Sequence, residues 1–227
     1  MADSVAGAGG IVGARIGGST LRWVAARATK RSIDIVGSVV ALLLLAPLLV
    51  GIALAIRLDS SGPALYAHGR VGRHGRPIRV LKFRTMVSDA DRVLHEHLAR
   101  RPDLRAAWDA TFKLTDDPRV TRVGRFLRRF SLDELPQLLN VLRGEMSLVG
   151  PRPVIEEELP RFGPSAEVVL RAVPGLTGLW AVSGRSDITY AERVELERRY
   201  VTDWSLRLDL SILVRTIPVV VRGHGSY

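Results

Sequence analysis

The sequence predicts a mainly α-helical protein with one small β-hairpin, attached to a membrane through a single helix near its N-terminus. Three observations lead to this fold class. No charged residue occurs from position 35 to position 56. Strand-like segments flank a glycine-rich turn between positions 62 and 84, and apolar residues recur at helical spacing in later segments. A chain of 227 residues is long enough for one domain with its own core beside a membrane segment.

Residues 1–29 are expected to form a flexible lead-in. Their first part, to about residue 20, consists mostly of Gly, Ala, Ser and Val with little pattern. It lacks a basic start followed directly by an apolar stretch and a cleavage site, so we expect no cleaved signal peptide.

Residues 30–58 are expected to form a membrane helix. The run Val39–Ile56 is apolar throughout, and about 20 apolar residues are needed to cross a bilayer. Lys and Arg flank the run on both sides, so their preference for the cytoplasmic side gives no direction of crossing. Pro47 removes the backbone hydrogen bond to Leu43 and bends the helix. These features favour a re-entrant, proline-broken helix that enters and leaves by the cytoplasmic face, and an ordinary kinked spanning helix is the alternative.

Residues 59–227 are expected to form the domain outside the membrane. The domain begins with a β-hairpin that turns at residues 73–76. Lys82 and Arg84 are alternate residues of its second strand and are therefore expected on the same face. Amphipathic or charged helices are predicted at 88–101 and 188–201. The final run, 203–221, is interrupted by charges and suits either the membrane interface or the core.

Two adjacent carboxylates, Asp133 and Glu134, stand where a helix is expected to begin. One interpretation is structural. Ser131 and Glu134 have the Ser-x-x-Glu spacing of a capping box, in front of an apolar helical stripe that ends at Gly144. Pro136 makes the exact start of this helix ambiguous by about two residues.

The other interpretation of this pair is chemical. Either helix start places Asp133 at the positive end of a helix dipole, which should keep it ionised and attract a phosphate. An ionised carboxylate beside a phosphate can act as a nucleophile. Because adjacent residues on a helix project about 100° apart, Asp133 and Glu134 are expected to serve one substrate in two roles. From these residues alone, the structural and chemical interpretations have about equal weight.

The charge of the chain indicates an acidic partner. There are 33 Lys and Arg residues against 23 Asp and Glu residues, a formal net charge of +10. The partner could be nucleic acid, anionic lipid or a phosphorylated substrate. Four arginines at helical spacing form a basic face that suits solvent or anionic lipid: Arg122, Arg125, Arg128 and Arg129. The chain contains no cysteine, which excludes disulfides and thiolate metal sites.

Several long motifs carry a family resemblance: residues 113–137, Lys82-Phe-Arg-Thr-Met86 and the Ser147–Pro153 run. From about residue 30 to its C-terminus the chain closely resembles the bacterial sugar transferases that are monotopic phosphoglycosyl transferases. The resemblance implies transfer of a sugar 1-phosphate from a UDP-sugar to polyprenyl (undecaprenyl) phosphate, with release of UMP. This would be the initiating step of exopolysaccharide, capsule or other glycoconjugate synthesis. It also implies a re-entrant helix with interfacial amphipathic helices, at the cytoplasmic face of the bacterial inner membrane.

The resemblance implies roles for individual residues as well. Asp133 would form a covalent aspartyl phosphosugar, and Glu134 would hold Mg2+. Basic residues in the matching motifs would bind the substrate phosphates: Lys82, Arg84, Arg128, Arg152 and Arg185. An arginine suits this role because a guanidinium grips phosphate oxygens in a bidentate fork. Pro47 would break the membrane helix.

Two non-enzymatic alternatives use the same positive charge. A membrane-tethered nucleic-acid-binding protein needs a reading helix or an aromatic platform. Aromatic residues make up only 6% of the chain and no such module is recognisable, so no nucleic-acid partner is expected. A membrane-surface scaffold fits the basic helices but gives no use for Asp133 beside Arg128 and Arg152. The transferase, with membrane lipids as further partners, is therefore the leading hypothesis. The sequence is compatible with a homo-oligomer and does not identify the sugar.

Overall fold

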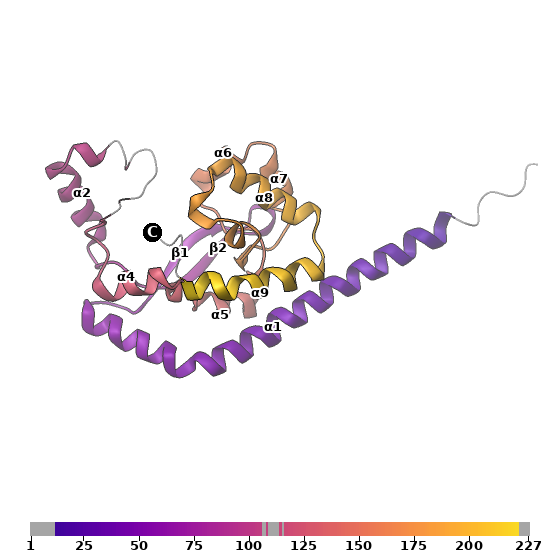
Figure 1. The fold of residues 1–227 in the computed structure, drawn as a ribbon, viewed down its shortest axis with the longest axis horizontal. Coiled ribbons are helices and arrows are strands. Elements are labelled where there is room, and N and C mark those ends of the chain that lie inside the picture. The colour runs from indigo at the N-terminus through magenta and orange to yellow at the C-terminus, as the bar shows by residue number, and fades with distance from the viewer. Residues whose placement is uncertain (1–11, 106–107, 109–113, 115, 223–227) are drawn as a thin grey trace, which may run out of the picture.

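The computed structural model describes residues 12–105, 108, 114 and 116–222, and its first element is a long helix, α1 (Val12–Asp59). Figure 1 shows α1 lying beneath the rest of the molecule and bent in its C-terminal part. Pro47 lies inside this helix, where it lacks the N–H that would bond to the carbonyl of Leu43. The expected proline-broken helix is thus corrected to a proline-bent one, because the helix continues on both sides of Pro47.

Helix α1 also begins earlier than expected. Residues 12–29, which were predicted to be a flexible lead-in, belong to this helix, and residues 1–11 lie outside the described residues. The reason is that extending an existing helix costs much less than starting one, and no proline occurs in 12–29 to stop it.

Most of the apolar surface of α1 is exposed. The stretch Trp23–Asp59 is long and apolar enough to cross a membrane, by length and composition. Its most apolar 18-residue window has a mean hydropathy of 3.0, and only 11% of that window is buried. Leu43 and Leu44 are 71% and 74% exposed. The core helix of a water-soluble domain would bury such residues, so this surface suits lipid.

Two small sheets organise the rest of the chain. Strands β1 (Leu65–Val71) and β2 (Pro77–Phe83) form the predicted antiparallel hairpin, joined through the 3-10 turn η1 (Arg73–Gly75). Strands β3 (Ser147–Val149) and β4 (Gly175–Thr177) form a parallel pair that the sequence did not predict. Three-residue strands are too short to show a recognisable alternation of apolar and polar residues.

Helices form most of what remains, which confirms a mainly helical protein with a small antiparallel sheet. Among the described residues, the helices after the hairpin are α2 (Ala90–Arg100), α4 (Arg122–Arg129), α5 (Gln137–Arg143), α6 (Leu159–Phe162), α7 (Ser165–Val169), α8 (Tyr190–Thr202) and α9 (Leu206–Arg222). The further 3-10 turns are η2 (Leu132–Glu134), η3 (Glu156–Glu158), η4 (Trp180–Val182) and η5 (Arg185–Asp187). Gly144 ends α5 in the left-handed conformation, with a φ of 80°, as predicted.

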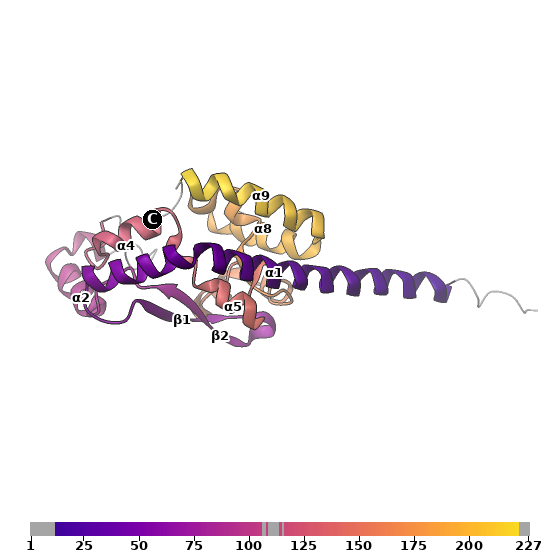
Figure 2. The ribbon, with the colours of Figure 1, turned by 90° about the horizontal axis from the view of Figure 1, so that it is seen from below.

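Helix α9 has an unusual distribution of polar and apolar residues. Figure 2 shows it running beside α1, on the side opposite the hairpin. It buries Asp209 together with Ile212, whereas Val214, Ile217 and Val221 are 68%, 65% and 70% exposed. A helix at the surface of a water-soluble protein normally turns its apolar side inward. The outward apolar side of α9 therefore suits the same apolar surroundings as α1.

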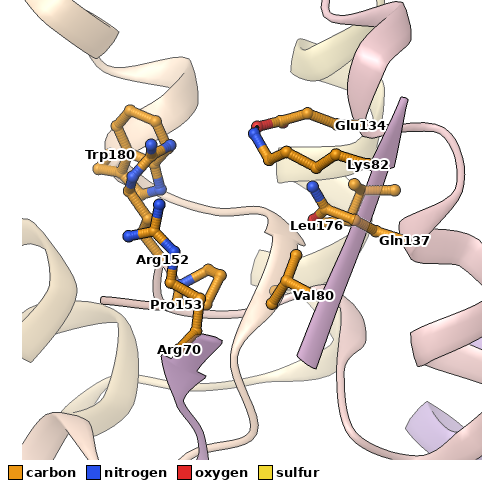
Figure 3. Close-up of a pocket in the computed structure, with 10 residues that line it drawn as sticks. Arg70, Val80, Lys82, Glu134, Gln137, Arg152, Pro153, Leu176 and Trp180 are labelled. Carbon is orange, nitrogen blue, oxygen red and sulfur yellow. Dashed lines mark hydrogen bonds and ion pairs between the residues drawn. The ribbon is translucent and has the colours of Figure 1, made fainter. Parts of the chain in front are cut away.

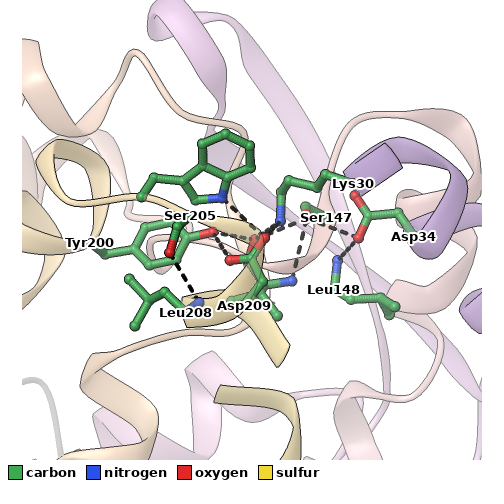
Figure 4. Close-up of polar contacts among 10 residues, drawn as sticks. Lys30, Asp34, Ser147, Leu148, Tyr200, Ser205, Leu208 and Asp209 are labelled. Carbon is green, nitrogen blue, oxygen red and sulfur yellow. Dashed lines mark hydrogen bonds and ion pairs between the residues drawn. The ribbon is translucent and has the colours of Figure 1, made fainter. Parts of the chain in front are cut away.

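A buried polar network attaches the N-terminal half of α1 to the rest of the chain (Figure 4). Lys30 Nζ donates to Asp209 Oδ2 at 2.7 Å and to the carbonyl of Val149 at 2.9 Å. The Tyr200 hydroxyl donates to Asp209 Oδ1 at 2.8 Å, and Trp204 Nε1 donates to Asp209 Oδ2 at 3.0 Å. The carboxylate of Asp209 is thus surrounded by donors from α1, from α8 and from the segment between α8 and α9.

Further contacts fix α1 on both sides of its exposed part. Before it, Asp34 Oδ1 accepts from Ser147 Oγ at 3.0 Å and from the backbone N–H of Leu148 at 2.9 Å. After it, Ile52 and Ile56 pack in one core cluster that also holds two residues from outside α1, Phe83 and Leu127. The same domain therefore holds the helix before and after the bend.

Candidate active site

The two adjacent carboxylates lie in a tight turn between two helices. Asp133 and Glu134 belong to the 3-10 turn η2, which follows α4 and precedes α5. Ser131 is in the left-handed conformation, with a φ of 54°, and makes no capping hydrogen bond. The predicted capping box is therefore wrong. Helix α5 begins only after Pro136, because a proline has no N–H to continue the turn's hydrogen bonds.

Lys82 contacts both carboxylates. Its Nζ lies 2.7 Å from Glu134 Oε1 and 3.5 Å from Asp133 Oδ2. Adjacent residues of a helical turn project in different directions. Both acids nevertheless reach the one ammonium, which stands at the end of a flexible side chain. This arrangement brings together two sequence motifs that are far apart in the chain.

Asn140 of α5 holds this helix against β2, the strand that carries Lys82. Its side-chain Oδ1 accepts from the backbone N–H of Leu81 at 2.9 Å, and its Nδ2 donates to the carbonyl of Arg79 at 2.8 Å. The amide thus occupies the free edge of β2 as a neighbouring strand would. Asn140 is fully buried, and no local sequence pattern indicates its role.

The two carboxyl groups have opposite pKa shifts. Burial raises the pKa of Asp133, whose side chain is 11% exposed, and the nearby Glu134 adds to this, while Lys82 and Arg128 oppose it. Burial also acts to raise the pKa of Glu134, but Lys82, Arg152 and Arg185 outweigh it and hold that pKa below its ordinary value. The expectation that a helix dipole would keep Asp133 ionised left out this cost of burial.

Arg128 is the arginine of α4 that turns inward. Its Nε donates to Thr85 Oγ1 at 3.0 Å, and its charge acts on Asp133. Arg122, Arg125 and Arg129 are exposed. The four arginines therefore do not form one basic face. Three of them face outward, and of the four only Arg128 lies beside the acids.

Arg84 does not join the site. Its guanidinium donates to the carbonyl of Ser60 at 2.8 Å and also to the carbonyl of Ser61, just beyond the end of α1. The prediction that Arg84 and Lys82 share a face is wrong because β2 ends at Phe83, so the alternation of side chains does not continue to Arg84. Arg84 therefore caps carbonyls that follow the end of α1.

A pocket opens beside Lys82 and Glu134, and Figure 3 shows its two walls. One wall carries Lys82, Glu134 and Gln137. The other carries Arg70, Arg152, Pro153 and Trp180. The guanidinium of Arg152 lies over the Trp180 ring, 4.9 Å from its centre. The pocket thus presents cationic groups on both sides, which suits an anionic ligand.

Arg185 lies at the edge of the same cluster. Its Nη2 donates to Ser131 Oγ at 2.8 Å, and its charge helps to lower the pKa of Glu134. Its backbone has a φ of 51°, a conformation that few residues other than glycine adopt. The structure therefore brings Lys82, Arg128, Arg152 and Arg185 together around the acids, whereas Arg84 lies elsewhere.

Glu197 of α8 supports Arg152 from behind. Its Oε1 accepts from the backbone N–H of Arg152 at 3.0 Å, which is the only backbone N–H in Pro151-Arg152-Pro153 because prolines have none. Glu197 is 1% exposed. Burial raises its pKa to about 7, although the hydrogen bond from Arg152 and the charges of Arg193 and Arg152 act against this. No sequence pattern distinguishes Glu197 from the many other charged residues of α8.

The acids also suit a magnesium ion. Mg2+ is usually held by one or two carboxylates together with substrate phosphates. Glu134 is kept ionised beside the pocket, and Asp133 is adjacent. Among the described residues there is no group of three His, Cys, Asp or Glu side chains that could hold a metal by themselves. The remaining oxygens would therefore come from substrate phosphates and water.

Comparison with known proteins identifies the family. A model of the bacterial sugar transferases matches residues 25–223. The exopolysaccharide production protein ExoY of Rhizobium meliloti is 51% identical over 198 residues, which cover 87% of this chain and 88% of ExoY.

Two further relatives are named as transferases. The undecaprenyl-phosphate galactose phosphotransferase of Salmonella typhimurium is 50% identical over 201 residues, 88% of this chain but 42% of that longer protein. The UDP-glucose:undecaprenyl-phosphate glucose-1-phosphate transferase of Caulobacter vibrioides is 43% identical over 220 residues, 92% of this chain and 76% of that protein. The match of the family model across nearly the whole described chain establishes that this chain belongs to the bacterial sugar transferase family.

Proposed function

We propose that this chain transfers a sugar 1-phosphate from a UDP-sugar to undecaprenyl phosphate, the first step in building an exopolysaccharide or a related glycoconjugate. The observation that carries the proposal is the cluster of Asp133, Glu134 and Lys82 beside a pocket whose far wall holds Arg152. The names of the relatives, which include undecaprenyl-phosphate sugar phosphotransferases, agree with it.

The first step uses Asp133 as the nucleophile. A carboxylate oxygen of Asp133 attacks the sugar-bearing phosphorus of the UDP-sugar. The bond from this phosphorus to the bridging oxygen breaks, and UMP leaves with that oxygen and its electron pair. An aspartyl phosphosugar remains. Lys82 and Arg128 favour the ionised form of Asp133, which is the form that attacks.

The second step regenerates the carboxylate. An oxygen of the undecaprenyl phosphate attacks the same phosphorus, and the bond between this phosphorus and Asp133 breaks. The product is an undecaprenyl diphosphate sugar. Throughout both steps, Arg128, Arg152 and Arg185 would hold phosphate oxygens in place, because guanidinium groups bind them in a bidentate fork.

Glu134, with Asp133 beside it, would hold Mg2+. When bound, Mg2+ would offset negative charge on the transferred phosphoryl group. In the protein alone, Lys82 provides the positive charge next to Glu134, at 2.7 Å.

We also propose that α1 is re-entrant and that the domain lies on the cytoplasmic face of the inner membrane. Two observations support this topology. Lys30 and Asp34, before the exposed apolar part of α1, and Ile52 and Ile56, after it, all contact the same domain. A straight crossing would carry the two ends to opposite sides of the bilayer. In addition, α9 turns an apolar side outward next to α1, as interfacial helices do.

The experiment that tests the reaction separates its two steps. Detergent-purified protein is incubated with Mg2+, a UDP-sugar and labelled UMP, without any lipid acceptor. A covalent intermediate predicts that label appears in the UDP-sugar, because the first step is reversible without the lipid. Asp133→Asn should abolish this exchange, and the exposed Asp91→Asn of α2 is the matched control. Exchange that persists in Asp133→Asn, or a lipid-dependent transfer without any exchange, would contradict the proposed intermediate.

A second assay, which measures UMP release, identifies the donor sugar. The named relatives act on galactose and glucose donors, so UDP-galactose and UDP-glucose are tested side by side, with undecaprenyl phosphate present. UMP release with neither donor, from protein that is folded, would count against the proposed function as a whole.

A further inference from the structure

Arg70 of β1 has unused hydrogen-bonding capacity. Its side chain is only 16% exposed, and the carboxylate oxygen nearest to it, Glu158 Oε1, is 4.0 Å from its Nη1. In the part of the chain that the structure describes, its guanidinium makes no hydrogen bond. A guanidinium carries five N–H donors. Among the described residues, no Arg70 nitrogen is one of the buried side-chain atoms without a partner, so these donors remain accessible to a ligand.

Two other inward arginines donate to carbonyls of the protein itself, although Arg84 Nε is buried without a partner among the described residues. Arg31 donates to the carbonyls of Val141 and Leu142, at 2.6 Å and 2.9 Å, and Arg84 donates to carbonyls just after α1. These arginines cap the ends of helices. Arg70 has no comparable role, so a purely structural explanation does not account for it.

Arg70 opens into the pocket beside Arg152. Figure 3 shows both side chains on the wall that faces Lys82 and Glu134. Burial, followed by the charge of Arg152, lowers the pKa of Arg70 to about 10. Arg70 therefore remains charged at neutral pH, and two like charges lie close enough to repel each other.

The anions of this wall are too few for its cations. Glu158 lies 3.3 Å from Arg193 and accepts from the Tyr190 hydroxyl at 3.3 Å, in addition to its long contact with Arg70. Glu197, the other acid near Arg152, has its pKa raised to about 7 and so carries only part of a charge at neutral pH. An anion placed between Arg70 and Arg152 would supply the missing charge and accept from both forks.

We propose that Arg70 is a further phosphate-binding residue, which grips a substrate phosphate together with Arg152. This inference rests on the proposed function for the identity of the anion. In the free protein, Arg70 makes only a 4.0 Å contact with Glu158. This contact is replaced by hydrogen bonds to the phosphate when the ligand binds. The phosphate belongs to the nucleotide donor or to the lipid acceptor, and the experiment distinguishes the two.

The first measurement is the binding of UDP to protein that cannot react. Three proteins that all carry Asp133→Asn are compared for their affinity for UDP. One keeps Arg70, one has Arg70→Gln and one has Arg70→Lys. Loss of a charge-assisted bidentate contact should weaken binding about ten- to a hundredfold in Arg70→Gln. Arg70→Lys should be intermediate, because it keeps the charge but loses the fork. Arg76→Gln, at the exposed hairpin turn, is the control and should bind UDP as before.

The second measurement is the KM for each substrate in otherwise unaltered protein. A raised KM for the UDP-sugar places the phosphate on the donor. Unchanged UDP binding with a raised KM for undecaprenyl phosphate places it on the acceptor. Either result supports the inference, and unchanged values for both substrates in Arg70→Gln overturn it. If Arg70→Gln does not fold, Arg70→Lys gives the same comparison. UDP binding that depends on Arg70, in protein that releases no UMP from any donor, would leave this inference standing and reject the proposed function alone.

Discussion

Lys30, before the exposed apolar part of α1, forms a 2.7 Å ion pair with Asp209 of α9. The side chains are 19% and 8% exposed, so the pair is largely shielded from water. Tyr200 and Trp204 donate to the same carboxylate. The pair therefore joins α1 to the C-terminal part of the domain through one shared anion.

Removing one member of this pair should destabilise the protein strongly. Lys30→Met leaves a buried carboxylate without its cation, and breaking a buried pair in this way costs about 3–5 kcal/mol. Asp209→Asn leaves the ammonium unpaired and should cost a similar amount. Thermal unfolding in detergent measures both. Asp203→Asn, at the exposed end of α8, is the control. A change in Lys30→Met no larger than in this control would refute the importance of the pair.

Lys82→Gln should change the pH dependence of activity. Lys82 is the largest influence that lowers the pKa of Glu134, so without it this pKa rises. If Glu134 acts in its ionised form, activity is lost as pH falls through that pKa. The acidic limb of the kcat/KM profile should therefore move to higher pH. Arg79→Gln, exposed on the same strand, should keep the original profile. An acidic limb that does not move would exclude Glu134 as its source.

Asn140→Ala should reduce both stability and activity. The substitution removes the partners of the Leu81 N–H and the Arg79 carbonyl, and a buried backbone group left unpaired costs about 1–3 kcal/mol. It also frees the strand that positions Lys82. We expect a lower unfolding temperature and a lower rate of UMP release. Leu139→Ala, exposed on the same helix, serves for comparison, and equal effects from the two substitutions would contradict this role.

Glu197→Gln should stabilise the protein above neutral pH. The pKa of Glu197 is about 7 in the folded chain against 4.5 for an ordinary glutamate, so the folded state holds a proton that the unfolded state has lost. Stability therefore falls as pH rises between these values, by about 3 kcal/mol in total. Glutamine still accepts from the Arg152 N–H but does not ionise, so this fall should disappear. Unfolding temperatures at pH 5 and pH 8 test it, with the exposed Glu195→Gln as the control.

The topology of α1 can be read directly, because the chain has no cysteine. Val24→Cys and Leu58→Cys introduce single thiols at positions 53% and 88% exposed, one on each side of Pro47. In sealed vesicles, a membrane-impermeant thiol reagent should reach both from the cytoplasmic side, as it should reach Arg76→Cys in the hairpin. Leu44→Cys should be protected in the bilayer. Labelling of Val24→Cys and Leu58→Cys from opposite sides would establish a spanning helix.

The sequence predicted the elements that depend on local pattern. The long apolar helix, the hairpin and the stop at Gly144 follow from apolar length, strand propensity and glycine chemistry. The capping box at Ser131 was wrong because a left-handed residue and Pro136 impose a 3-10 turn. Arg84 was misplaced because the strand ends one residue earlier.

The missed features depend on contacts between distant parts of the chain. Asn140 acts on the edge of a strand about 60 residues before it in the sequence. Glu197 is identified only by the backbone N–H that it accepts, and Arg70 only by its place opposite Lys82 in the folded pocket. Motif resemblance assigned phosphate binding to Arg152. No local pattern could show that Arg70, from the hairpin, lines the same pocket as Arg152.

The docking of α1 has a consequence for how the protein is made. The carboxylate that receives Lys30 belongs to Asp209, which lies 179 residues further along the chain. During synthesis α1 therefore leaves the ribosome well before the anion that holds it exists, and Lys30 can pair only after the domain between the two residues has been made. A chain truncated before α9 would keep α1 but would lack the carboxylate that attaches it to the domain.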